Sequence, residues 1–378
     1  MITKLAFVLL SITITQAKQL QKITLTQNQP KIIAHRGYSG KYPEHTIQAY
    51  QEGAKYADII ECDLAITKDR KLICLHDSWF ADQTNADEVF ANDRPKTSRY
   101  VKHQNTIIEN QYFSIDFTLN ELKKLTKVHD KKKFHFRTND DDQDSNKYKI
   151  CTFGEFLTVA YDNQVDIYVE TKNQWFFNNW LASQKNPTTF EDILFQEMLN
   201  FIDYRVELGL LNSYSGSITW YVQSFFVDSL ITLKEMINYN RESCGEVDYI
   251  VEEGVKDFVY VYLSNEVISE GILQQLRKHQ INNLGLNKKL VLNNQTDHLN
   301  NNLFNHYHSK LGFKIYIYTM RNEAKYVNQY QETLFQSDWK KEMLYFLTNF
   351  PEISGYFTDF PEDWRNAFEN QVEFSDRN

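Results

Sequence analysis

The run Ile59-Ile60-Glu61-Cys62-Asp63-Leu64 carries two carboxylates, two residues apart, within an otherwise apolar stretch. Side chains of a β-strand point alternately to opposite sides, so Glu61 and Asp63 are expected to share one face, with Cys62 facing away into the core. Short runs that are apolar on both faces are typical of the buried strands of a parallel sheet. The stretch therefore predicts a central strand, over about 58–65, that carries two charges on one side.

Further short apolar runs accompany this one, at 31–35, 72–76, 165–172, 217–225, 314–319 and 355–358. Helical patterns lie between several of them, at 46–56, 152–161, 190–208, 227–240 and 298–311. Thr152 and Glu155 have the spacing of a capping box and predict that a helix begins there. Strands that alternate with helices predict a parallel sheet in an α/β fold, and the chain length suits one TIM (β/α)8 barrel.

The 378 residues are 42% hydrophobic and 24% charged, which is enough for one large core and argues against disorder. The formal charge of −9 argues against a nucleic-acid partner, because such proteins normally present a basic surface. A small anionic substrate would need a local cation or a few basic side chains. Oligomeric state stays open.

The first residues resemble a secretory signal peptide, with Lys4 before an apolar run that ends near Ile14 and small residues around Ala17. The run is shorter than the roughly 20 apolar residues that a spanning helix needs. We expect residues 1–17 to be removed and residues 18–378 to form one domain, secreted or in the lumen of the secretory pathway, without stable membrane insertion. The four cysteines would permit up to two disulfides in an oxidising compartment, and Asn294 begins a glycosylation sequon.

A polar segment over about 77–150 interrupts the alternation and predicts an insertion after the third strand. It contains the acidic run 140–142, which lacks the glycine and the terminal glutamate of an EF-hand, so a solvated loop is expected there.

Histidines follow two of the predicted strands, where a parallel barrel places its active site. His35 and Arg36 come directly after the run at 31–34, and His76 ends the run at 72–76. Two histidines near a metal can share acid and base roles, since their ordinary pKa lies near 6.5. Either histidine alone would be weak evidence.

Carboxylates on separate strand ends predict a site for a hard cation. Inside a barrel, Glu61 and Asp63 would repel each other unless a cation or a salt bridge compensates them. Glu170 ends the run at 165–172, with Lys172 on the same face. Three oxygen ligands favour Ca²⁺ or Mg²⁺ over zinc.

Several motifs together resemble the glycerophosphodiester phosphodiesterase family, most closely its bacterial periplasmic type. They are HRGYSGKYPEHT at 35–46, IIECDL at 59–64, LICLHD at 72–77, VETK at 169–172, QSF at 223–225 and SGYFTDFPEDW at 354–364. The segments YFSIDFTLNELKKL at 112–125 and IYIYTMR at 315–321 are similar as well. The resemblance covers nearly the whole mature chain and implies a TIM barrel with an insertion after the HD motif.

The resemblance also implies roles for individual residues. His35 and His76 would be the catalytic pair, Glu61, Asp63 and Glu170 the metal ligands, and Arg36 and Lys172 the phosphate-binding groups. Glu44, in PEHT where many relatives have PENT, would support the mouth of the barrel by hydrogen bonds or cap a helix beside Thr46. Gln223 would touch substrate or metal-bound solvent, and Tyr318 stands where many relatives carry a tryptophan. The implied reaction is metal-dependent hydrolysis of diesters such as glycerophosphocholine or glycerophosphoethanolamine to glycerol 3-phosphate and an alcohol.

Two alternatives remain at this point. A related barrel phospholipase of the C or D type would act on intact lipids and favour an exposed apolar rim, for which the insertion offers Trp79, Phe80, Phe113 and Phe117. These four side chains are instead expected to form a small core of the insertion. A non-catalytic binding protein on the same fold would usually have lost a ligand or a histidine, and here the set is complete.

Overall fold

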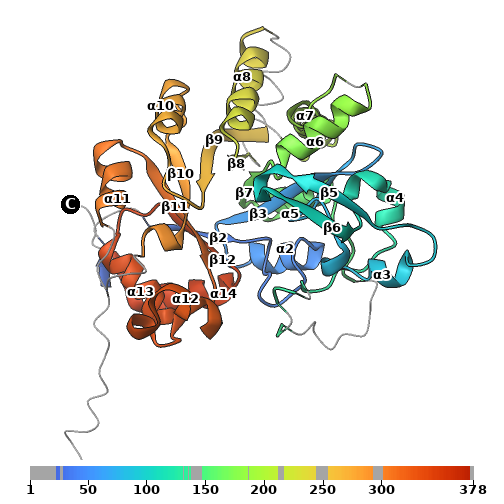
Figure 1. Cartoon of the computed structure of the whole chain (residues 1–378). Helices are drawn as coiled ribbons and strands as arrows, with labels where there is room; N and C mark the ends of the chain where they lie inside the picture. The colour runs from blue at the N-terminus through green and yellow to red at the C-terminus, as the bar shows by residue number, and fades with distance from the viewer. Residues whose placement is uncertain are drawn as a thin grey trace, which may run out of the picture.

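The protein folds around a closed barrel of eight parallel strands (Figure 1). The computed structural model describes residues 23–25, 29–130, 132–134, 136–137, 147–185, 187–211, 217–243, 254–292 and 301–374. The barrel order is β2-β12-β11-β10-β9-β8-β7-β3, closed by pairing of β2 with β3. Its strands are β2 (Lys31–Ala34), β3 (Ile59–Ile66), β7 (Asp166–Glu170), β8 (Ile218–Ser224), β9 (Val255–Ser264), β10 (Asn283–Asn287), β11 (Lys314–Met320) and β12 (Gly355–Thr358). The TIM barrel expected from the alternation is confirmed.

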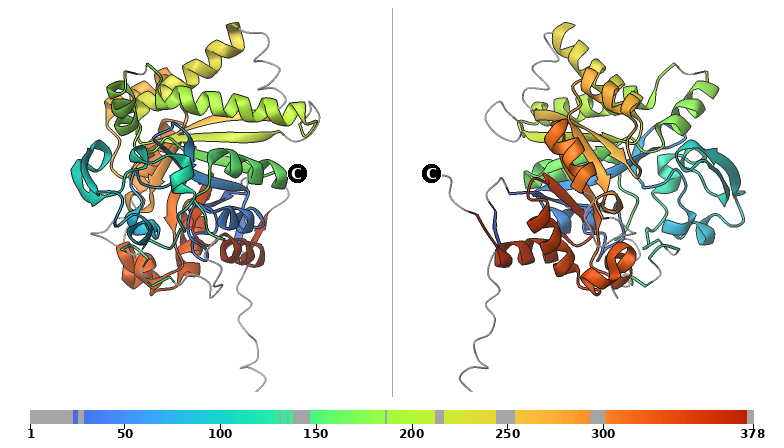
Figure 2. Two further views of the ribbon diagram at one scale, coloured as in Figure 1. Left: turned by 90° about the vertical axis from the view of Figure 1, so that its right-hand side faces the viewer. Right: turned by 60° about the vertical axis from the view of Figure 1, so that its left-hand side comes forward.

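Helices surround the barrel and connect its strands, with the long α7 and α8 along the outside (Figure 2). The sequence patterns at 46–56, 152–161, 190–208 and 227–240 correspond to helices α2, α5, α7 and α8. Thr152 and Glu155 form the expected capping box at the start of α5. The helices are α2 (Ile47–Ala54), α5 (Phe153–Asn163), α6 (Gln174–Ser183), α7 (Phe190–Glu207), α8 (Val227–Ser243), α10 (Glu270–Lys278), α11 (Asn301–Asn305), α12 (Ala324–Phe335), α13 (Trp339–Asn349) and α14 (Pro361–Gln371).

One predicted strand runs in the other direction, and two barrel strands, β9 and β10, were not predicted. The run at 72–76 forms β4 (Leu72–Cys74), which pairs antiparallel with β3 and so extends the sheet without joining the parallel barrel. Strand β9 contains the apolar run Phe-Val-Tyr-Val-Tyr-Leu at 258–263, which was not among the predicted strands, and β10 is only Asn-Leu-Gly-Leu-Asn. Strand β10 forms because its neighbours β9 and β11 supply the hydrogen bonds, which a short sequence window does not report.

The insertion is a small lobe beside the barrel (Figure 1). It contains the hairpin of β5 (Thr97–Val101) and β6 (Thr106–Gln111), together with α3 (Ala86–Val89) and α4 (Leu119–Leu122). Trp79, Phe80, Phe113 and Phe117 are all buried, and they pack on one another and on neighbouring rings. They belong to the main hydrophobic core, which is continuous with that of the barrel, so the separate small core expected for the insertion is not found among the described residues. None of these four therefore supplies the exposed rim that action on intact lipids would favour.

Three of the four cysteines lie in the described part of the chain, whereas several other predicted features do not. Cys62, Cys74 and Cys151 are buried free thiols, and Cys62 faces the core as expected. The predicted signal peptide at 1–17, Cys244, the acidic run at 140–142 and the sequon at Asn294 lie outside the described residues. Strands β1 (Ile23–Leu25) and β13 (Val372–Phe374) pair near the two ends of the chain. Across the described ranges, every helix is too short or too polar to cross a bilayer.

Candidate active site

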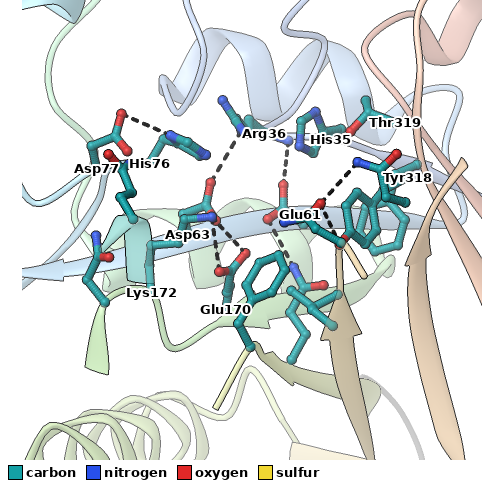
Figure 3. Close-up of a pocket in the computed structure, with 18 of the residues that line it drawn as sticks. His35, Arg36, Glu61, Asp63, His76, Asp77, Glu170, Lys172, Tyr318 and Thr319 are labelled. Carbon is teal, nitrogen blue, oxygen red and sulfur yellow. Dashed lines mark hydrogen bonds and ion pairs between the residues drawn. The ribbon is translucent and has the colours of Figure 1, made fainter. Parts of the chain in front are cut away.

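Three carboxylates meet inside the carboxyl end of the barrel. Asp63 on β3 lies opposite Glu170 on β7, and Glu170 lies opposite Gln223 on β8, so the strand register brings these side chains into one row. Glu61, Asp63 and Glu170 each offer an oxygen within 4.8 Å of the others, and all three are buried (Figure 3). The shared face of Glu61 and Asp63 is therefore confirmed as the barrel interior.

The protonation of these carboxyl groups shows how unfavourable the cluster is without a cation. Burial and the charge of Asp63 raise the pKa of Glu61 well above its usual range. Burial also raises the pKa of Glu170, to about 8, with a further contribution from Asp63. Burial acts in the same direction on Asp63, but Lys172 and other basic neighbours outweigh it and hold its pKa low. Three buried oxygen donors with this mutual repulsion fit a divalent hard cation.

Two basic side chains flank the carboxylates. The Nζ of Lys172 lies 3.0 Å from Glu170 Oε1 and 3.5 Å from Asp63 Oδ1. The Arg36 guanidinium lies 3.3 Å from Asp63 Oδ2 and donates to Glu44 Oε2 at 2.7 Å, while the Arg36 backbone N–H donates to Glu61 Oε2 at 2.8 Å. Glu44 thus supports the mouth by orienting Arg36, whereas Thr46 caps α2.

His35 is held by a charged network that sequence reasoning did not find. Its Nδ1 lies 2.6 Å from Asp359 Oδ1, in the loop after β12. The other carboxylate oxygen, Asp359 Oδ2, accepts hydrogen bonds from Arg137 Nη2 and Arg321 Nε, each at 2.7 Å. Arg137 comes from the insertion and also donates to Glu323 Oε1 at 2.7 Å. Asp359 therefore orients the His35 imidazole through Oδ1 and is itself held in place by Arg137 and Arg321 through Oδ2.

His76 has a carboxylate partner too. Its Nδ1 lies 3.1 Å from Asp77 Oδ2, and Asp77 also accepts a hydrogen bond from Gln83. Burial, with a further contribution from Arg36, lowers the pKa of His35 to about 4 and that of His76 to about 3. Both rings are consequently neutral near pH 7 in the free protein, and each can accept a proton.

A cavity of about 300 Å³ lies over these groups and has room for a small phosphodiester. Gln223 lines it and donates to Glu61 Oε1 at 3.2 Å, and Tyr318 lines it beside Phe225. Below the carboxylates, Tyr168, Tyr221 and other aromatic side chains fill the barrel and exclude water from that side. All ten residues singled out from the sequence lie in or beside this cavity.

Three residues that complete the site were missed, and two of them left a signal in the sequence. Asp359 follows the apolar run at 355–358, so the rule that pointed to Glu170 would also have pointed to it. His45, in PEHT, is fully buried and bridges Asp63 Oδ2, at 3.0 Å from Nε2, to the Tyr50 hydroxyl, at 2.7 Å from Nδ1. Arg137 left no signal, because the insertion around it has no periodic pattern.

One family and one named relative match most of this chain, and a second relative matches part of it. The family described as Glycerophosphoryl diester phosphodiesterase matches residues 35–362. Glycerophosphodiester phosphodiesterase GDPD6 of Arabidopsis thaliana is 31% identical over 367 residues, which cover 93% of this chain and 89% of the plant protein. A glycerophosphodiester phosphodiesterase of Haemophilus influenzae is 33% identical over 38% of this chain and 40% of its own length.

Solved structures share the fold at low sequence identity. A phosphodiesterase of Oleispira antarctica, solved in complex with the product sn-glycerol-3-phosphate, gives a TM-score of 0.51 at 14% identity, with 90% of this chain and 97% of that chain covered. A glycerophosphoryl diester phosphodiesterase of Parabacteroides distasonis gives 0.51 at 13% identity, covering 94% and 95%.

The fold and these matches define a class, the TIM-barrel hydrolases of phosphoric diesters. Within it, the extent of the family match decides the assignment: this chain belongs to the glycerophosphoryl diester phosphodiesterase family. The alternative of a non-catalytic binding protein is set aside.

Proposed function

We propose that this enzyme cleaves glycerophosphodiesters such as glycerophosphocholine and glycerophosphoethanolamine to glycerol 3-phosphate and an alcohol, with the help of a divalent cation. The observation that carries the proposal is the cluster of Glu61, Asp63 and Glu170, whose ligand oxygens lie within 4.8 Å of one another between two histidines. The family match supports the reaction, and the cavity of about 300 Å³ supports a small substrate.

Glu61, Asp63 and Glu170 would hold the cation, and their oxygen donors favour Ca²⁺ or Mg²⁺. When bound, the cation would supply a positive charge that stabilises the negative charge developing on the phosphoryl oxygens. Arg36 and Lys172 line the cavity beside these ligands and would neutralise the phosphate from two sides. Such preplaced charges usually make the largest single contribution to a reaction of this kind.

His35 is proposed as the general base. Asp359 accepts a hydrogen bond from Nδ1–H across 2.6 Å, which leaves Nε2 unprotonated and able to take a proton from the attacking water as its oxygen bonds to phosphorus. His76, backed by the carboxylate of Asp77, would protonate the leaving alkoxide. Its low pKa means that the acidic form must be stabilised by the negative charge of the bound substrate.

A substrate whose leaving group departs without being protonated distinguishes the general base from the general acid. His35→Ala and His76→Ala should both lose turnover of glycerophosphocholine by about 100-fold or more. A glycerophosphodiester of p-nitrophenol should restore much of the rate in His76→Ala but not in His35→Ala, because its leaving group departs as the anion. Restoration of the rate in His35→Ala alone would show that His35 is the general acid and His76 the general base. A wild-type rate in either variant would exclude the replaced histidine from the mechanism and so contradict the proposed pair.

The reaction itself is tested by its products and its metal. Purified protein with Ca²⁺ or Mg²⁺ should release glycerol 3-phosphate from glycerophosphocholine, as detected by a coupled dehydrogenase assay. A chelator should abolish the release, and excess cation should restore it. Release of choline phosphate, or undiminished activity in excess chelator, would contradict the proposal.

We propose further that residues 1–17 direct the protein into the secretory pathway and are then removed. The support is the short apolar run that follows Lys4. The mass and N-terminal sequence of the protein recovered from its natural source should show a chain that begins near Lys18. A chain that retains residues 1–17 in the cytosol would contradict export.

A further inference from the structure

A second hollow continues from the active-site cavity toward the insertion. It has a volume of about 390 Å³ and shares two lining residues, Asp77 and Gln104, with the cavity over the carboxylates. Asp77 follows His76, and Gln104 lies between β5 and β6, so the hollow opens between the second histidine and the hairpin. We call this hollow the leaving-group trough. A diester whose phosphate sits at the carboxylates has room to extend its alcohol into it.

The lining of the trough is predominantly acidic. Four carboxylates face two ammonium groups in it, namely Asp77, Asp82, Glu109 and Asp130 against Lys132 and Lys133. The lysine side chains are 69% and 49% exposed, and each is tied to an acid of the trough, Lys132 to Asp82 at 2.8 Å and Lys133 to Asp77 at 3.6 Å. The balance of fixed charge therefore favours a cationic group in the trough over an anionic one.

Two buried oxygens of the trough lack a hydrogen-bond donor among the described residues. They are Asp77 Oδ1 and Gln111 Oε1, on residues that are 3% and 5% exposed. The orientation of the Gln111 amide follows from its partner, because Gln111 Nε2 donates to the carboxylate of Asp82 at 3.1 Å and so leaves Oε1 as the free atom. A buried acceptor without a donor is costly, and both atoms are acceptors.

We propose that the trough is a subsite for the leaving alcohol and that it selects a protonated primary amine, as in ethanolamine. The inference rests on the proposed function. A primary ammonium supplies both missing features, a positive charge for the acidic lining and N–H donors for Asp77 Oδ1 and Gln111 Oε1. The choline head group has the charge but no N–H donor, and a glycerol head group has donors but no charge.

The test compares three substrates that differ only in the leaving alcohol: glycerophosphoethanolamine, glycerophosphocholine and glycerophosphoglycerol. The wild-type enzyme should have its highest kcat/KM on glycerophosphoethanolamine. Glu109→Gln and Gln111→Met should each lower that value about tenfold, mainly through KM, since a hydrogen bond or ion pair to a charged group is lost. The same variants should leave glycerophosphoglycerol within about twofold of wild type.

Asp93→Asn is the matched control, because Asp93 is an exposed acid of the same lobe that lines neither the cavity nor the trough. It should change none of the three values. Glu109 is exposed, so Glu109→Gln tests the trough even if Gln111→Met disturbs folding. An equal loss on all three substrates, or a wild-type enzyme without preference for the amine, would overturn the subsite while leaving the proposed function intact. Failure to cleave any of the three would overturn the proposed function instead.

Discussion

Replacing Asp359 by asparagine should disable the proposed base while preserving the shape of the site. The two arginines that donate to Asp359 Oδ2, Arg137 and Arg321, are each 2.7 Å away and will draw the amide oxygen of the new side chain to that side. The amide NH₂ must then take the place of Oδ1, 2.6 Å from His35 Nδ1. It can only donate there, so Nδ1 becomes the acceptor and the proton of the neutral ring moves to Nε2.

The expected decrease in kcat follows from the loss of general base catalysis by His35. An imidazole with its proton on Nε2 cannot accept the proton of the nucleophile, and general base catalysis typically contributes a factor of about 100 to 10,000. We therefore expect kcat to fall by about that factor, with little change in KM. Stability should fall too, by about 3 kcal/mol, because the buried guanidinium of Arg137 and the partly exposed one of Arg321 lose the charge that compensates them.

Glu323→Gln serves as the matched control for this substitution. Glu323 also accepts a hydrogen bond from Arg137, at 2.7 Å, but makes no contact with His35. It should cost stability without the loss in kcat. Steady-state kinetics and denaturant unfolding of both variants measure the two effects separately, and ¹⁵N NMR of the His35 ring reports the tautomer directly. Wild-type kcat in Asp359→Asn, or an equal loss of kcat in Glu323→Gln, would refute the tautomer argument.

Two further predictions concern stability. Burial holds the pKa of His35 at about 4 and that of His76 at about 3, below the ordinary value of 6.5, so between these limits the unfolded chain binds more protons than the folded one. The raised pKa values of Glu61 and Glu170 act in the opposite direction over part of this range, so the histidine contribution is measured as a difference from a variant. The free energy of unfolding of the metal-free protein minus that of His76→Gln should fall as pH drops from about 6.5 toward 4, and a pH-independent difference in a urea series would contradict this. Glu342→Leu should cost about 3 to 5 kcal/mol, because it leaves the Lys288 ammonium buried without its partner at 2.6 Å. The double variant Lys288→Met/Glu342→Leu should regain most of that loss, and equal stability of the single and double variants would show that the pair is not the cause.

Much of the barrel could be predicted from the sequence because strand burial leaves a local pattern. The runs that became β2, β3, β7, β8, β11 and β12 are short and apolar on both faces. The pattern fails where a strand depends on its neighbours. In β10, only Leu284, Gly285 and Leu286 are apolar, yet the strand is hydrogen-bonded on both sides, to β9 and β11. The direction of β4 was equally hidden, since an apolar run has the same pattern in parallel and antiparallel pairing.

The sequence by itself determined which side chains share a face. Alternation along a strand is a property of the backbone, so the common direction of Glu61 and Asp63, and the opposite direction of Cys62, follow from spacing alone. The need for a compensating positive charge follows as well, because two carboxylates on a buried face repel each other.

Only the tertiary structure decided which partners complete those groups. Asp359 reaches His35 across 324 positions of the chain because barrel closure pairs β12 with β2, and Arg137 reaches Asp359 because the insertion folds back over the mouth. The register of β3 against β7 sets Glu170 beside Asp63. These contacts depend on how strands align and on where a connecting segment passes, and no local spacing encodes either.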